Sequence, residues 1–140
     1  MTATLFSQAL TSFTDHEVSF ASDGTSRGWA EFVSLAGRAC AALEQSEGER
    51  WAIDLDDPFD FAAGLIGCWA AGKTAVIAPR PMIETAEADV HIDGLLGASI
   101  QTAHRRCLDF HALDGPRARS LDLAAGSRLD LYTSGSTGRP

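Results

Sequence analysis

The hydrophobic pattern between residues 29 and 78 predicts a helix, a strand, a second helix and a second strand, in that order. Apolar residues three and four positions apart from Trp29 to Leu43 are typical of an amphipathic helix. A short apolar run at 51–55 predicts a strand. Segment 59–71 is apolar nearly all round and predicts a buried helix, because it has no polar face for solvent. The apolar run at 74–78 predicts the next strand.

Capping residues mark the ends of these elements. Asp57 before Pro58 is typical of a helix N-terminus, and Gly48 and Gly72 are the expected stops of the two helices. A buried helix between two apolar strands is typical of a βαβ unit with parallel strands. We therefore predict an α/β fold, with βαβ units and a mostly parallel sheet flanked by helices.

The flanking segments give weaker patterns. Alternating apolar residues predict a strand at 127–132, with Leu129 and Leu131 facing the same way. No linker, repeat or low-complexity segment divides the chain, so residues 1–140 are expected to form one partial domain. The remaining predictions are a helix at 2–13, a strand at 17–22, a strand at 88–92, a helix at 95–104 and a strand at 108–113.

Composition narrows the possible partners and the compartment. The 140 residues carry a formal net charge of −8, which disfavours nucleic acid and anionic membrane surfaces as partners. Cys40, Cys68 and Cys107 are odd in number and show no close pairing, so we expect no disulfides and a reducing compartment. No apolar stretch has the length of a membrane span, and the N-terminus does not resemble a signal peptide. We therefore expect a cytoplasmic protein.

Glycines and hydroxyl side chains gather directly after the strand predicted at 127–132. Glycine allows close backbone approach and positive φ, while hydroxyls and exposed amides can donate hydrogen bonds to phosphate oxygens. A polar, disordered tail is the alternative interpretation. The strand that runs straight into this segment favours the phosphate loop. Its candidate binding residues are Thr133, Ser134, Gly135, Ser136, Thr137 and Gly138.

Residues 67–74, Gly-Cys-Trp-Ala-Ala-Gly-Lys-Thr, formally match the nucleotide-binding loop of P-loop NTPases. That loop must follow a strand and open a helix, so that the helix N-terminus meets the phosphates. Here the segment closes a helix and opens a strand. We therefore interpret Gly72 as a helix cap and Lys73 as a solvated residue at the strand start.

One possible metal site comes from His104, Cys107 and His111, which are spaced three and four residues apart. On a helix they would share one face, with Asp109 or Asp114 close by, as zinc ligands do. The alternation at 108–111 breaks that face and favours a strand without metal.

Asp54, Asp56 and Asp57 form an acidic cluster after the strand predicted at 51–55. Carboxylates in such a position can hold Mg²⁺. More often they cap the next helix, and Asp57 fits that role. His16 and His91 have no evident partner in the sequence.

The C-terminal segment Tyr132-Thr-Ser-Gly-Ser-Thr-Gly-Arg-Pro140 resembles the signature loop of the adenylate-forming (AMP-binding) enzymes. This superfamily contains acyl- and aryl-CoA synthetases, the adenylation domains of nonribosomal peptide synthetases, and luciferases. Residues 28–43 are similar to the family's early helix. Residues 51–79 resemble its strand, buried helix and next strand, including the Gly67–Gly72 ending that produces the P-loop-like match.

The resemblance implies a ligase that joins a carboxylic acid to ATP, giving an acyl-adenylate and pyrophosphate. Coenzyme A or the phosphopantetheine thiol of a carrier protein would then accept the acyl group. The implied cofactors are ATP with Mg²⁺, and the implied partners are a small carboxylic acid and an acyl carrier protein. Residues 133–138 would contact the β- and γ-phosphates of ATP.

The family pattern continues beyond Pro140 with a lysine, later nucleotide-binding motifs, an acid pocket and a C-terminal lid. We therefore expect this sequence to be the front part of a longer ligase, with no catalytic residue of its own and no activity alone. The alternative is a non-catalytic binding or scaffold fragment of the same fold. Unpaired sheet edges would then promote self-association.

Overall fold

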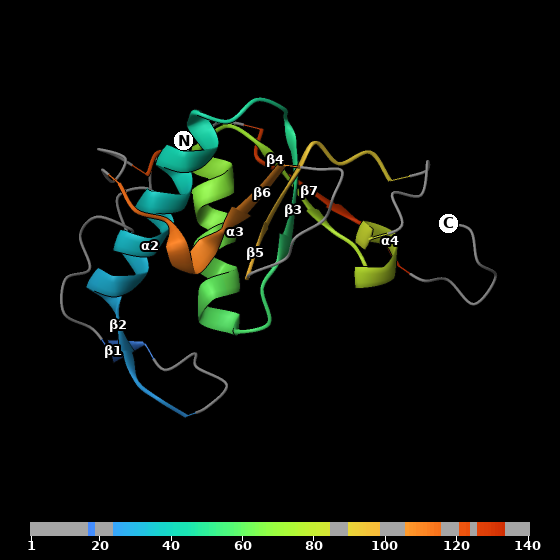
Figure 1. Ribbon diagram of the computed structural model, residues 1–140. Coiled ribbons are helices and arrows are strands. Elements are labelled where there is room, and N and C mark those ends of the chain that lie inside the picture. Colours follow the sequence, from blue (N-terminus) through green and yellow to red (C-terminus); the bar gives the residue numbers. More distant parts are fainter. Residues whose placement is uncertain are drawn as a thin grey trace.

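The computed structural model describes residues 17–18, 24–84, 90–98, 106–115, 121–123 and 126–133, which form both strands and helices (Figure 1). In chain order they are β1 (Glu17–Val18), β2 (Arg27–Gly28), α2 (Trp29–Glu44), β3 (Arg50–Asp54), α3 (Pro58–Ala70), β4 (Thr74–Ile77), α4 (Arg80–Glu84), β5 (Gly94–Gly97), β6 (Arg106–Asp109), the 3-10 helix η1 (Phe110–Ala112) and β7 (Arg128–Leu131). No helix in these described ranges has the length and apolarity needed to cross a membrane.

A five-stranded sheet with the order β6-β5-β3-β4-β7 forms the centre of the fold. Every neighbouring pair in it is parallel. In the middle of the sheet, Trp51 of β3 pairs with Ala75 of β4 on one side and with Gly94 of β5 on the other. The α/β class and the mostly parallel sheet predicted from the sequence are therefore confirmed. The pair β1–β2 is a separate antiparallel ribbon.

Helices α2 and α3 pack against each other and cover one face of the sheet (Figure 1). The two helices lie close together at Gly67, where an added Cβ would lie 2.7 Å from the carbonyl oxygen of Ala36 and 2.7 Å from the Cβ of Ala39. Glycine is therefore needed for this helix packing, independently of any nucleotide. The core on this face also contains Trp51 and Phe59, both completely buried.

The opposite face of the sheet has a smaller apolar cluster. Ala52 and Val76 of the central strands pack there with Ile83 of α4 and with Val90 and Ile92. Short helix α4 lies on this side, away from α2 and α3 (Figure 1). The sheet is thus covered by two long helices on one face and by a short helix and a loop on the other.

The sequence predictions differ from the structure mainly between residues 88 and 113. The predicted helix at 95–104 is wrong at its start, because Gly94–Gly97 form β5. The predicted strand at 88–92 is wrong over its described residues 90–92, which form a bend and a loop. The strand predicted at 108–113 begins earlier, at Arg106, and gives way to η1 at Phe110.

Smaller differences concern the ends of elements. Helix α2 ends at Glu44, before the expected stop at Gly48, whereas α3 ends beside Gly72 as expected. The helix predicted at 2–13 lies outside the described residues, as does all but the start of the strand predicted at 17–22.

Candidate functional site

Several polar side chains meet at the carboxyl edge of the sheet. Strands β3, β4 and β7 are adjacent and parallel, so their last residues, Asp54, Ile77 and Leu131, lie along the same edge. Ligand sites in open α/β sheets form outside the carboxyl ends of the strands. This edge is therefore the first place to look for a binding site.

Thr133, the first residue of the predicted phosphate loop, lies at this edge because it follows β7 directly after Tyr132. The amide of Tyr132 donates a 2.8 Å hydrogen bond to the carbonyl of Ile77, which extends the β4–β7 ladder by one residue. Thr133 follows and is exposed. The other predicted loop residues, 134–138, lie outside the described part of the chain. The structure thus places the entrance of the predicted loop beside the end of β4.

The acidic cluster after β3 divides into two roles. Asp57 caps α3, because its carboxylate accepts hydrogen bonds from the amides of Phe59 and Asp60, both at 3.0 Å. Asp54 and Asp56 instead pair with Arg80, with nitrogen–oxygen distances of 3.1 and 3.2 Å.

The hydrogen bond from Arg80 to Asp54, and to a smaller extent the one to Asp56, raises the pKa of the Arg80 guanidinium group above its ordinary value. Asp57 therefore has the predicted capping role. Asp54 and Asp56 instead bind two different nitrogens of the Arg80 guanidinium group near the carboxyl ends of the strands.

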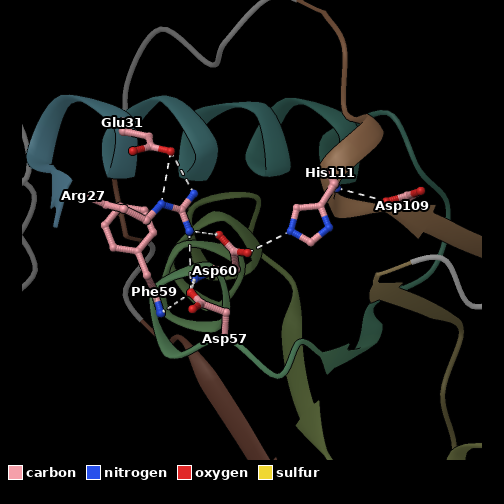
Figure 2. A network of polar contacts seen from close by, with 7 residues as sticks. All are labelled: Arg27, Glu31, Asp57, Phe59, Asp60, Asp109 and His111. Atoms are coloured by element: carbon pink, nitrogen blue, oxygen red, sulfur yellow. Dashed lines mark hydrogen bonds and ion pairs between the residues drawn. The ribbon is translucent and has the colours of Figure 1, made fainter. Parts of the chain in front are cut away.

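A second polar network surrounds the N-terminus of α3, and Figure 2 shows it from close by. Its centre is Asp60, a carboxylate only 5% exposed. One oxygen of Asp60 accepts a 2.8 Å hydrogen bond from Arg27, and the other lies 2.8 Å from Nε2 of His111 (Figure 2). The buried carboxylate is thus compensated on both oxygens, as burial of a charge requires.

Arg27 connects this network to helix α2. Its guanidinium group also pairs with Glu31 at 2.8 Å and lies 4.1 Å from the centre of the Phe59 ring (Figure 2). The hydrogen bond to Glu31 is the largest of the effects that raise the pKa of Arg27. This network was not predicted from the sequence. Its one sequence signal is Asp60 itself, a single carboxylate inside an otherwise apolar helix.

The structure separates the residues of the possible zinc site. Cys107 lies in β6, while His111 lies in η1 and contacts Asp60. His104 is outside the described residues. Among the residues that are described, no three His, Cys, Asp or Glu side chains are grouped so that they could hold a metal ion.

The P-loop-like segment at 67–74 ends α3 and begins β4, as predicted from the sequence. The P-loop NTPase interpretation is therefore excluded by the order of the elements. The expectation that Lys73 is solvated is wrong. Its ammonium group donates to the carbonyls of Ser46 and Gly48, at 3.0 and 2.7 Å, because the connection after α2 passes over the start of β4.

The cysteines form no disulfide, as expected. Cys40 and Cys68 are buried between the helices and the sheet, and this burial raises the pKa of each thiol to about 12. Both thiols are therefore protonated at neutral pH and unsuited to nucleophilic chemistry.

Comparison with solved structures shows what this fold is similar to. O-succinylbenzoate coenzyme A synthetase (MenE) from Bacillus subtilis, in complex with AMP, superposes with a TM-score of 0.72 and 18% identity, over 95% of this chain and 39% of that chain. The Klebsiella oxytoca NpsA N-terminal subdomain, in complex with 3-hydroxybenzoyl-AMSN, gives a TM-score of 0.68 and 18% identity, over 99% and 38%. The nonribosomal peptide synthetase FmoA3, bound to AMPPNP, gives a TM-score of 0.69 and 17% identity, over 94% of this chain and 16% of that chain.

These similarities show the fold of the N-terminal subdomain of adenylate-forming enzymes. The chain spans less than half the length of each of these structures. No family model matches the sequence, and no curated protein matches it either.

Proposed function

We propose that this chain is the N-terminal part of an ATP-dependent, AMP-forming carboxylic acid ligase, and that residues 133–138 bind the phosphates of ATP. The observation that carries the proposal is the course of β7. This strand lies at the side of the sheet next to β4 and runs into Thr133 at the carboxyl ends of the strands. The solved structures of similar fold support it, since one of them is a complex with AMP and another a complex with 3-hydroxybenzoyl-AMSN.

The residues of the loop suit the departure of pyrophosphate. In the proposed reaction, a carboxylate oxygen of the substrate attacks the α-phosphorus of ATP. The bond from that phosphorus to the bridging oxygen then breaks, and pyrophosphate leaves with the electron pair. Hydroxyl and amide donors fixed around the β- and γ-phosphates would stabilise this developing charge. The proposed donors are Thr133, Ser134, Ser136 and Thr137, with Gly135 and Gly138 allowing close approach.

Mg²⁺ would accompany ATP and neutralise part of the phosphate charge. The acyl-adenylate would then pass to a thiol, either coenzyme A or the phosphopantetheine of a carrier protein. In this proposal the acid pocket and the thiol site would lie in the remainder of the ligase, and the similar solved chains are indeed more than twice as long as this one. We therefore expect the 140 residues alone to show no acid-dependent exchange of pyrophosphate into ATP.

Calorimetric titration with magnesium pyrophosphate tests the phosphate loop without requiring catalysis. The wild-type chain should bind, and Ser136→Ala and Thr137→Ala should each weaken binding roughly tenfold or more, because each removes a hydrogen bond to a charged group. Ser34→Ala is the matched control, since it removes a hydroxyl from helix α2 and leaves the sequence of the loop unchanged. Wild-type chain that does not bind, or loop variants that bind like wild type, would contradict the proposal.

The edge of β7 supports a second candidate function, association with another protein surface. Leu129 and Leu131 are 39% and 64% exposed on this strand, which pairs only with β4 among the described strands. Exposed apolar strand edges promote pairing with other chains. Equilibrium sedimentation at several concentrations tests this candidate, and a monomer throughout the range would count against it.

A further inference from the structure

We infer that Arg50 is a positioning residue for the proposed phosphate loop, which it holds through the hydroxyl of Tyr132. This inference rests on the proposed function. Arg50 begins β3, two strands away from β7 in the sheet. Its guanidinium group nevertheless reaches across β4, pairs with the carboxylate of Asp130 and donates a 3.0 Å hydrogen bond to the phenol oxygen of Tyr132.

The base of this arginine is itself fixed. Its amide donates to the carboxylate of Asp93 at 2.9 Å, and its carbonyl accepts from the Asp93 amide at 2.7 Å. Its Nε donates to the carbonyl of His91 at 2.7 Å. All three guanidinium nitrogens therefore have a defined partner, and a planar guanidinium group held in this way has little freedom to move.

The end of β7 has little other support. Among the described strands β7 pairs with β4 alone, and it contributes four residues to the ladder. Its apolar side chains Leu129 and Leu131 remain exposed, so they add little burial to hold it. The side chains of Asp130 and Tyr132, on the other face, are joined to β3 by Arg50.

Tyr132 is the residue directly before the loop, and its backbone amide is already bonded to Ile77 of β4. Its hydroxyl adds a second attachment, to the first residue of β3. Two attachments at one residue fix both its backbone and its ring. The direction in which the chain leaves the sheet at Thr133 is thereby set before any phosphate binds, which is how a supporting residue preorganises a binding loop.

Tyr132 is the only tyrosine of the chain, so isotopically labelled tyrosine gives an NMR ring signal from this one site. We expect Arg50→Gln to shift this signal in the ligand-free protein. Arg50→Gln and Tyr132→Phe should each weaken magnesium pyrophosphate binding about threefold to tenfold, the usual range for one lost hydrogen bond. The double variant should bind no more weakly than Arg50→Gln, because both changes break the same connection.

Two comparisons separate positioning from general stability. Arg106→Gln makes the same chemical change on β6, the opposite edge of the sheet, where the arginine pairs with Glu47. This control should leave pyrophosphate binding unchanged. Tyr132→Phe removes one hydroxyl without removing the ring, so it tests the connection even if Arg50→Gln is too unstable to purify.

The outcomes distinguish this inference from the function on which it rests. Wild-type chain that does not bind pyrophosphate overturns the proposed function and the positioning role together. Binding that is weakened by Thr137→Ala but unaffected by Tyr132→Phe overturns the positioning role alone. A Tyr132 ring signal that does not respond to Arg50→Gln also overturns it.

Discussion

The face of the sheet covered by α2 and α3 is held together by different interactions from the β7 edge, the side of the sheet formed by Arg128–Leu131. On the covered face, Trp51, Phe59 and Leu43 are completely buried, and α2 approaches α3 so closely that Gly67 has no room for a side chain. At the β7 edge, Leu129 and Leu131 are exposed, and polar contacts of Arg50 hold the strand. Apolar packing therefore stabilises one region, while directed hydrogen bonds orient the other.

This difference indicates that the residues that stabilise the fold and the residues proposed to bind phosphate lie in different regions of the chain. A region with few buried apolar contacts contributes little to the free energy of unfolding, and binding segments are commonly drawn from such regions. The proposed phosphate loop begins at the less packed of the two regions. Substitutions in the two regions should therefore separate, with large effects on unfolding from the covered face and small ones from the edge.

The largest effect on unfolding is expected for Trp51→Ala. The indole is completely buried and lies directly over Gly94, where no Cβ would fit beside it. Its loss leaves a cavity that should lower the free energy of unfolding by about 3–5 kcal/mol. Denaturation by urea measures the change. A loss below about 1 kcal/mol would mean that the covered face is not the main source of stability.

The next effect in size is expected for Asp60→Asn, which tests the polar network at the N-terminus of α3. Removing the buried charge weakens the contacts with Arg27 and His111 and should cost about 1–3 kcal/mol of unfolding free energy. Glu31→Gln is the matched control. Glu31 is an exposed partner of the same arginine, so its loss should cost no more than about 0.5 kcal/mol. Equal losses for the two variants would show that burial of Asp60 is unimportant.

A smaller, pH-dependent effect is expected at Asp93, beside the first residue of β3. The amide hydrogen bond from Arg50, ahead of the one from Glu49, holds the pKa of this carboxyl below its usual value. A carboxyl whose pKa is lowered by folding stabilises the protein above its unfolded pKa of about 4, and this stabilisation is lost as the pH falls through the folded pKa.

Asp93→Asn should therefore reduce the loss of stability on acidification below about pH 4, as followed by thermal unfolding at several pH values. An acid transition identical to that of wild type would exclude this carboxyl as a contributor.

The smallest effect on unfolding is expected for Leu131→Lys at the β7 edge. The side chain is 64% exposed, so the change in unfolding free energy should stay within about 0.5 kcal/mol. If the edge promotes self-association, the charge should reduce it, because a lysine on an edge strand opposes pairing. Sedimentation of the wild-type chain and of Leu131→Lys at matched concentrations measures the change in self-association. A loss of stability comparable to that of Trp51→Ala would remove the contrast between the two regions.

The sequence predicted those elements whose pattern carries a period or a cap. The apolar spacing of 29–43, the Asp57-Pro58 start and the strand before Tyr132 all appear in the structure close to their expected positions. Strand β5 was missed because its four residues are all buried, as expected for a parallel strand covered on both faces, and so show no alternation. An apolar run without a period does not distinguish a strand from a helix.

For the candidate site, the sequence predicted local arrangements but not contacts between distant segments. Asp57 as a cap and the helix end at Gly67–Gly72 both follow from neighbouring residues. The pairs Arg27–Asp60 and Arg50–Tyr132 join residues 33 and 82 positions apart, so no local pattern could reveal them. The phosphate-binding role of residues 133–138 stays a prediction.

The most direct test of that role is residue-by-residue NMR of the backbone amides during titration with magnesium pyrophosphate. We predict that the largest shifts fall on residues 133–138, with smaller ones at Tyr132 and at the end of β4, and that α2 and α3 are unaffected. Absence of shifts, or shifts centred on the P-loop-like segment at 67–74, would contradict it.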